Sequence, residues 1–175
     1  MLRKLNGFFG LFLLIFIGVA TTTGARAQEY SYTSPKAEFS VEFPSPAWKK
    51  TGEPDDIHQH TEFVYGDRWD GLLRIRREAL PEGVTIKDFA LRDQDERTRF
   101  LPGFMPGKDE AFNGRLDGVT VSYEFTQAGK AMSGRSYYLK ADAQTVYVLR
   151  FTGLRAKLLG IRNQTDAIAR SLKLK

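Results

Sequence analysis

The only two histidines of the chain, His58 and His60, stand two positions apart in the segment DDIHQHTEF. If this segment is a β-strand, alternate residues share a face, so both imidazoles and the carboxylate of Glu62 project together. Imidazole and carboxylate groups bind zinc and other borderline metals, which makes His58 and His60 candidate metal ligands. The His-x-His spacing is unspecific, however, and the solvated start of an ordinary strand is the interpretation that we favour.

The strand expected after this segment argues against a metal. Residues 58–65 and 72–78 form two extended runs, and the loop GDRWDG between them predicts a β-hairpin. Symmetric pairing about the loop places His60 opposite Arg77, and a cation that faces a ligand repels a metal ion. We therefore expect no cofactor, and we keep metal binding by His58 and His60 as the less favoured alternative.

The same hairpin carries residues that are suited to a protein interface. Trp69 lies in the loop beside Arg68, while Arg74 and Arg76 alternate along the second strand. Tryptophan and arginine contribute more to binding free energies than their numbers suggest. We predict that these four residues belong to a partner-binding surface; the alternative is that the arginines only face solvent.

The sequence contains no recognisable catalytic centre. The chain has no cysteine, which removes thiolate nucleophiles, and no serine lies in a Gly-x-Ser-x-Gly elbow. Paired carboxylates occur in RDQDER, but arginines interleave them at helical spacing, and we interpret them as exposed ion pairs. No glycine cluster has a phosphate-loop or dinucleotide pattern. We therefore expect a protein that is not an enzyme.

The N-terminus has the organisation of a secretory signal peptide. Two basic residues precede an apolar run of 13 residues from Phe8 to Ala20, and the small residues of ARA follow. The run is shorter than the ~20 residues that a membrane-spanning helix requires. We expect cleavage after Ala27, export to the periplasm or the extracellular medium, and no stable membrane span afterwards. Retention of the segment as an anchor is the alternative.

Removal of residues 1–27 changes the charge balance of the chain. The full sequence carries a net charge of +5, and three basic residues but no acidic residue leave with the signal peptide, which reduces it to +2. So small an excess does not support nucleic-acid binding, and we expect none. Residues 28–175 have the length of one domain with its own core.

Antiparallel strands are expected to dominate this domain. YSYTS and FSVEF alternate as strands do, and Thr85 with Asp88 forms a variant capping box that starts a helix over 86–100. Four further strands, joined by short turns in a meander, are expected at 109–112, 119–127, 132–141 and 145–152. The arrangement predicts an α+β fold with a single antiparallel sheet.

A C-terminal amphipathic helix is the clearest pattern in the chain. Residues recur along one helical face at intervals of three and four, at Leu154, Leu158, Ile161, Thr165, Ile168 and Leu172. One strand face, that of Val119, Val121, Tyr123 and Phe125, is apolar and the other polar. We expect the C-terminal helix to cover this apolar face and the opposite face to need no helix.

Five segments occur in a recognisable order: AEFSVEFP with a following tryptophan, REALPEGVTIKDF, NGRLDGVTVSYEF, YYLKADAQTVYVLRFTG and IARSLKLK. Together they resemble the PsbP-like domains, the superfamily of the extrinsic photosystem II protein P and the Mog-type Ran-binding proteins. The resemblance covers residues 28–175 and implies an α/β/α sandwich, with a single antiparallel sheet flanked by helices, and a non-catalytic accessory or binding role. The resemblance assigns no functional residue to this chain, because the residues on which it rests are core and turn positions that define the fold.

The function we expect is that of an exported, non-catalytic accessory or binding protein with an unknown protein partner. One alternative is a carrier of a small apolar ligand or lipid, which would need a cavity lined by residues such as Tyr123, Phe125 and Leu149. The other alternative is a metal-binding protein that uses His58 and His60.

Overall fold

The computed structural model describes residues 30–34 and 39–175, and the signal peptide predicted at 1–27 lies outside them. The strands are β1 (Tyr30–Thr33), β2 (Phe39–Phe43), β3 (Trp48–Gly52), β4 (Thr61–Tyr65), β5 (Gly71–Ala79), β6 (Met105–Phe112), β7 (Gly118–Gln127), β8 (Lys130–Lys140), β9 (Thr145–Leu154) and β10 (Lys173–Leu174). The helices are α1 (Ile86–Thr98), α2 (Arg155–Gly160) and α3 (Arg162–Ser171). Within these ranges, no helix combines the length and the apolar character needed to cross a bilayer.

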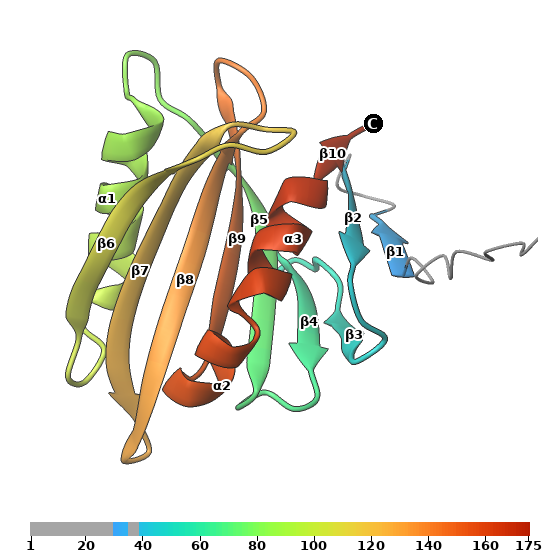
Figure 1. The fold of residues 1–175 in the computed structure, drawn as a ribbon. Helices are drawn as coiled ribbons and strands as arrows, with labels where there is room; N and C mark the ends of the chain where they lie inside the picture. Colours follow the sequence, from blue (N-terminus) through green and yellow to red (C-terminus); the bar gives the residue numbers. More distant parts are fainter. Residues whose placement is uncertain (1–29, 35–38) are drawn as a thin grey trace, which may run out of the picture.

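The described strands form two antiparallel sheets rather than the single sheet that we expected (Figure 1). Seven strands run in the order β3-β4-β5-β9-β8-β7-β6, and β2 lies between β1 and β10 in a smaller sheet. Alternate residues of β2, namely Phe39, Val41 and Phe43, are buried in a core shared with residues of the large sheet. The N-terminal strands therefore add a layer over the large sheet instead of extending its edge.

Helices cover both faces of the large sheet, not one face as the alternation in β7 suggested (Figure 1). Helix α1 packs over Val119, Val121 and Tyr138, whereas the C-terminal helices and β2 pack over Tyr137 and Phe151 on the opposite face. The C-terminal helix thus lies on the face opposite to the one we predicted. Successive residues of β8 point to opposite faces, and both Tyr137 and Tyr138 are buried. Strand β8 therefore lies in the middle layer of a three-layer structure.

The β4–β5 hairpin is present, but its register differs by one residue from symmetric pairing. Gly71 is already part of β5 and pairs with Tyr65, which shortens the loop and shifts every pair along the hairpin. Strand β4 begins at Thr61, after both histidines. The strand alternation that we inferred for His58 and His60, and the arginine expected opposite the second of them, are therefore wrong.

Helix α1 begins as predicted, but polar residues attach it to the sheet. The backbone N–H of Asp88 donates to Thr85 Oγ1 over 3.1 Å, which caps the first turn. Only one of the four buried residues is apolar; the set is Ala90, Asp93, Gln94 and Thr98. The exposure that we expected for the carboxylates of RDQDER is wrong for Asp93, which is 6% exposed.

The carboxylate of Asp93 joins α1 to three strands. Its Oδ1 accepts hydrogen bonds from Arg76 (2.6 Å) and Arg97 (2.7 Å), and its Oδ2 accepts from Arg150 (2.9 Å) and Tyr138 (2.8 Å). Burial alone would raise the pKa of Asp93, but the charges of Arg76 and Arg150 outweigh burial and hold the pKa below its usual value. The buried carboxylate is therefore charged at neutral pH.

We expect Asp93→Asn to lower the free energy of unfolding by about 3–5 kcal/mol, because it leaves the largely buried guanidinium of Arg150 without a counter-charge and leaves Arg76 with Glu78 alone. Asp95→Asn is the matched control in the same helix, since Asp95 is exposed and its carboxylate pairs with Arg99 at 3.2 Å. The control should change stability by less than about 0.5 kcal/mol. Urea unfolding of both variants measures the difference, and equal losses would contradict the anchoring role of Asp93.

The contribution of Asp93 should also depend on pH. An aspartate in an unfolded chain has a pKa of about 3.9, and the folded-state pKa of Asp93 is lower than usual. Its stabilisation is therefore complete above about pH 4 and is lost as the pH falls further. In a series of urea titrations, the wild type should lose stability more steeply below about pH 4 than Asp93→Asn does. Parallel curves for the two proteins would show that Asp93 has no depressed pKa.

The expected C-terminal helix is divided into α2 and α3. Ile161 lies between them with φ −106° and ψ 13°, outside the helical range, and Leu154 is the last residue of β9. The remaining positions of the pattern, Leu158, Ile161, Thr165, Ile168 and Leu172, are all buried as predicted. The periodicity thus identifies the buried face correctly but does not show the bend.

Candidate functional site: a groove beside helix α2

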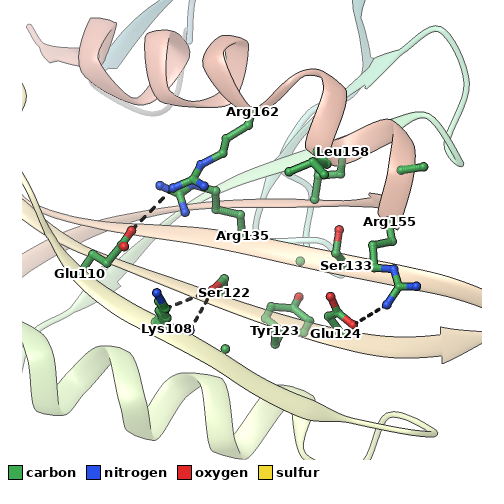
Figure 2. A pocket seen from close by; sticks show the side chains of 14 residues that line it. Lys108, Glu110, Ser122, Tyr123, Glu124, Ser133, Arg135, Arg155, Leu158 and Arg162 are labelled. Carbon is green, nitrogen blue, oxygen red and sulfur yellow. Dashed lines mark hydrogen bonds and ion pairs between the residues drawn. The ribbon is translucent and has the colours of Figure 1, made fainter.

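A groove opens between α2 and the part of the large sheet formed by β6, β7 and β8 (Figure 2). Its volume is about 610 Å³, within the range of small-molecule and peptide sites. The apolar side chains of its lining are those of Ala156, Leu158 and Leu159, and the charged ones are those of Lys108, Glu110, Glu124, Arg135, Arg155 and Arg162. The groove therefore offers both apolar contacts and charges.

The groove exists because the C-terminal helices cover only part of their face of the large sheet and leave β6 and β7 uncovered beside α2. Helix α2 has only six residues and packs on β8 and β9, while α3 packs on β2 of the smaller sheet. Strand β7 presents short or polar side chains on this face, including Ser122 and Glu124, and β6 is exposed along its length except at Phe112. The side chains on this side of the sheet thus face solvent.

Arg135 is held firmly at the floor of the groove. Its Nε donates to the hydroxyl of Tyr137 (2.7 Å), and one terminal nitrogen donates to Asp166 Oδ1 (3.2 Å). The hydroxyl of Tyr137 donates to the same carboxylate oxygen (2.5 Å) and lies 2.8 Å from Thr165 Oγ1. These contacts connect β8 to α3 and fix the orientation of the Arg135 guanidinium, which is only 14% exposed.

The chemistry of this cluster favours binding over catalysis. Burial and the hydrogen bond to Asp166 raise the pKa of Tyr137, so its hydroxyl stays protonated and does not act as a base at neutral pH. The hydrogen-bonding and charged partners of Arg135 outweigh burial and raise the pKa of its guanidinium, which therefore remains charged. No histidine lies among the described residues that line the groove. A cation held in a fixed orientation suits recognition of an anion.

The other charged residues of the groove form looser pairs. Arg155 donates to Glu124 at 2.9 Å, and Arg162 lies 3.7 Å from Glu110, a separation without a hydrogen bond. All four side chains are between 39% and 56% exposed, so solvent screens these pairs and each contributes little stability. The ammonium of Lys108 has no carboxylate within 4.0 Å among the described residues. Lys108 and the loosely paired Arg162 are thus accessible to a ligand.

Strand β6 is an edge strand that a partner strand cannot easily extend. Its pairing with β7 is interrupted between Pro106 and Asp109. Ser122 Oγ fills the interruption, because it accepts from the backbone N–H of Lys108 and donates to the carbonyl of the same residue, both at 3.1 Å. A Cβ at Gly107 would lie 2.5 Å from this oxygen, so the position requires glycine. Proline and a bulge both protect an edge from strand addition.

The four residues predicted to bind a partner are not part of the groove. Arg68 and Arg74 both bind the buried carboxylate of Glu62, at 2.5 Å and 3.1 Å, and Arg76 binds Asp93. Trp69 packs beside a small apolar cluster, and the ammonium of Lys130 lies 4.4 Å from its ring centre. All four thus make contacts within the chain near the β4–β5 hairpin, with Arg68 and Arg74 about half exposed, and their role in partner binding stays a prediction.

The two histidines lie close together without a third ligand. Their ring centres are 5.9 Å apart; His58 Nδ1 lies 3.3 Å from Asp55, and His60 Nε2 lies 3.9 Å from Glu62. Burial and the nearby positive charge of Arg74 lower the pKa of His60. Across residues 30–34 and 39–175, no three His, Asp or Glu side chains are arranged to hold a metal ion. Metal binding by His58 and His60 stays an untested alternative.

Of the three residues that we named for a lipid-carrier cavity, only Tyr123 is part of the groove lining. Tyr123 and Phe125 pack on the α1 face beneath Leu101 and Phe104, whereas Leu149 belongs to the core on the opposite face. The three therefore cannot line one cavity.

None of the four cations of the groove, Lys108, Arg135, Arg155 and Arg162, was predicted from the sequence. One signal was present: Arg135 alternates with Tyr137 and Leu139 and so occupies a core-facing position of its strand. A charged residue at such a position needs a buried partner. That partner, Asp166, is 31 residues away on a helix whose placement the pattern of β8 does not reveal.

Comparisons with known proteins identify the fold. No protein-family model and no curated protein matches the sequence. Cyanobacterial PsbP from Synechocystis sp. PCC 6803 is similar in structure with a TM-score of 0.62 and 12% identity, over 91% of this chain and 99% of that chain. The Ran-binding protein Mog1p from Saccharomyces cerevisiae is similar with a TM-score of 0.60 and 8% identity, over 85% and 96%.

A protein from Bacteroides thetaiotaomicron is similar with a TM-score of 0.56 and 18% identity over 83% of this chain. The chain spans 48%, about half, of that protein's length. Identities this low establish a shared fold and no shared activity. The resemblance seen in the sequence is thus confirmed for the architecture: the described chain has the PsbP-like fold.

Proposed function

We propose that this chain is an exported, non-catalytic accessory protein that binds a partner protein in the groove beside α2. One observation carries the proposal: an immobilised arginine, exposed cations and the 68% exposed side chain of Leu159 line a single hollow. Apolar and arginine contacts placed together are typical of protein interfaces. Mog1p, which has the same fold, is described as a Ran-binding protein, which supports a protein partner as the class of ligand.

A protein segment suits this groove better than a lipid does. Sites for small apolar molecules enclose most of the ligand surface. Here the lining residues Arg155, Arg162, Glu110 and Glu124 are about half exposed, so an acyl chain in the groove would remain in contact with water. A peptide loses less from such contact, because its backbone and polar side chains form hydrogen bonds with the surrounding water.

The groove can be tested by photo-crosslinking in the organism that makes the protein. Leu159→p-benzoylphenylalanine should give one covalent adduct with a protein that mass spectrometry identifies. Phe100→p-benzoylphenylalanine is the control, because Phe100 is equally exposed, at 76%, but follows α1 on the other side of the sheet. It should not capture the same protein.

The captured protein, purified separately, should bind the wild type, and Leu159→Asp should weaken that binding at least tenfold because it buries a charge. Phe100→Asp should bind as the wild type does. Equal effects of the two substitutions, or adducts at both positions, would remove the groove as the binding site.

The proposed export rests on the expected signal peptide and can be measured independently. Protein recovered from its native host should begin at Gln28, because cleavage is expected after Ala27. Intact-mass spectrometry of the soluble exported fraction gives the N-terminus directly. A chain that begins at Met1 and sediments with membranes would show that the segment is retained as an anchor.

A further inference from the structure

We propose that the end of the groove around Arg135 recognises a carboxylate on an extended segment of the partner, so that the ligand is an acidic peptide. The inference deepens the proposed function and rests on it. Figure 2 shows Arg135 and Arg162 at this end, and the Arg155–Glu124 pair at the other end. The two ends therefore differ in how much of their charge is already neutralised.

Arg135 has donors to spare in a fixed orientation. A guanidinium has five N–H donors. Arg135 uses one for Tyr137 and one for Asp166, and its remaining N–H groups have no acceptor among the described residues. Because the two bonds hold the side chain in place, a ligand does not have to immobilise it. A pre-oriented guanidinium favours the planar, two-oxygen geometry of a carboxylate.

The surrounding charges add to this preference. Arg162 makes no hydrogen bond to Glu110, and Lys108 pairs with no carboxylate in the described part of the chain. Arg135, Arg162 and Lys108 together supply three positive charges at this end of the groove. The carboxylates of Glu110 and Asp166 supply two negative charges. The excess of one positive charge is complementary to one acidic side chain, and partial burial of Arg135 strengthens the attraction.

The remaining lining determines what accompanies the carboxylate. Leu159 exposes an apolar side chain beside Ala156 on α2, where an apolar residue of the ligand can pack. The ligand backbone cannot easily add to the sheet, because the bulge at Gly107 interrupts the edge of β6. Side chains rather than strand pairing must therefore provide the specificity. The fitting ligand is an extended segment with one acidic residue and an apolar residue near it.

The probe is a phage-displayed library of random heptapeptides selected against the exported protein. Enriched peptides should share an Asp or Glu near an apolar residue. A synthetic copy of the best peptide should bind in fluorescence anisotropy, and exchange of its acidic residue for the matching amide should weaken binding at least tenfold. Failure to enrich any acidic motif, or equal affinity of the amide peptide, would overturn the proposal.

Variants assign the effect to named residues. Arg135→Lys keeps the charge but loses the planar pair of donors. Arg162→Gln removes an exposed charge without burying a polar group. Each variant should bind the acidic peptide at least several-fold more weakly. Arg99→Gln is the control, since Arg99 is an equally exposed arginine that follows α1. It should leave the affinity unchanged. Unaltered thermal unfolding of Arg162→Gln excludes misfolding as the cause, and unchanged affinity of this variant would contradict the proposed site.

Two further outcomes separate this inference from the proposed function. Oleyl alcohol, which has the same apolar chain as a fatty acid but no carboxylate, should not displace the peptide at the same concentration; displacement would favour an apolar-ligand site and overturn the acidic peptide. If the partner captured through Leu159 binds equally well to wild type, Arg135→Lys and Arg162→Gln, carboxylate recognition is wrong while partner binding in the groove stands. If no partner is captured at Leu159 and no peptide binds, both proposals fail.

Discussion

A buried carboxylate that accepts four hydrogen bonds attaches helix α1 to the large sheet. Helix α1 buries few apolar side chains, so hydrophobic burial alone would attach it weakly to the sheet. Asp93 compensates, because its two oxygens accept from three arginines and a tyrosine that β5, β8, β9 and α1 itself supply. The pairing keeps the carboxylate charged despite its burial, and a buried charge is tolerable only when its partners are complete. The placement of α1 therefore depends on Asp93 together with the apolar contacts of Ile86, Phe89 and Ala90.

A second pair of carboxylate and guanidinium, Asp166 and Arg135, lies on the opposite face of the sheet. Its carboxylate accepts fewer hydrogen bonds than that of Asp93. At Asp93 the acceptor is saturated, and the cluster is closed to ligands. At Asp166 one oxygen accepts from Arg135 and Tyr137, and the guanidinium keeps unused donors that face the groove. Saturated polar clusters stabilise a fold, whereas a fixed group with spare donors can bind. The saturated carboxylate at Asp93, together with the position of Arg135 in the groove lining, is the physical basis for assigning structure to one site and recognition to the other.

The groove is a consequence of how the third layer is built. The bend at Ile161 directs α3 toward β2, so that the two helices and the small sheet together cover β5, β8 and β9. Beside α2 the layer ends before β6 and β7, although α3 reaches Phe112 at the end of β6, and the bulged edge strand forms the far wall. Bulges of this kind are common beside functional sites because they redirect side chains and end strand pairing. The groove is thus bounded by a short helix on one side and a protected edge on the other.

The sequence alone determined the features that arise from local periodicity: the α+β class, most strand positions, the start of α1 at Thr85 and the buried face of the C-terminal helices. The tertiary structure decided what depends on contacts between distant segments. The hairpin register shifted because one turn residue joined β5, and the N-terminal strands formed a separate sheet. Lys108, Arg135 and Arg162 line one groove from three different elements, and a pattern of neighbours along the chain cannot show which charges come together.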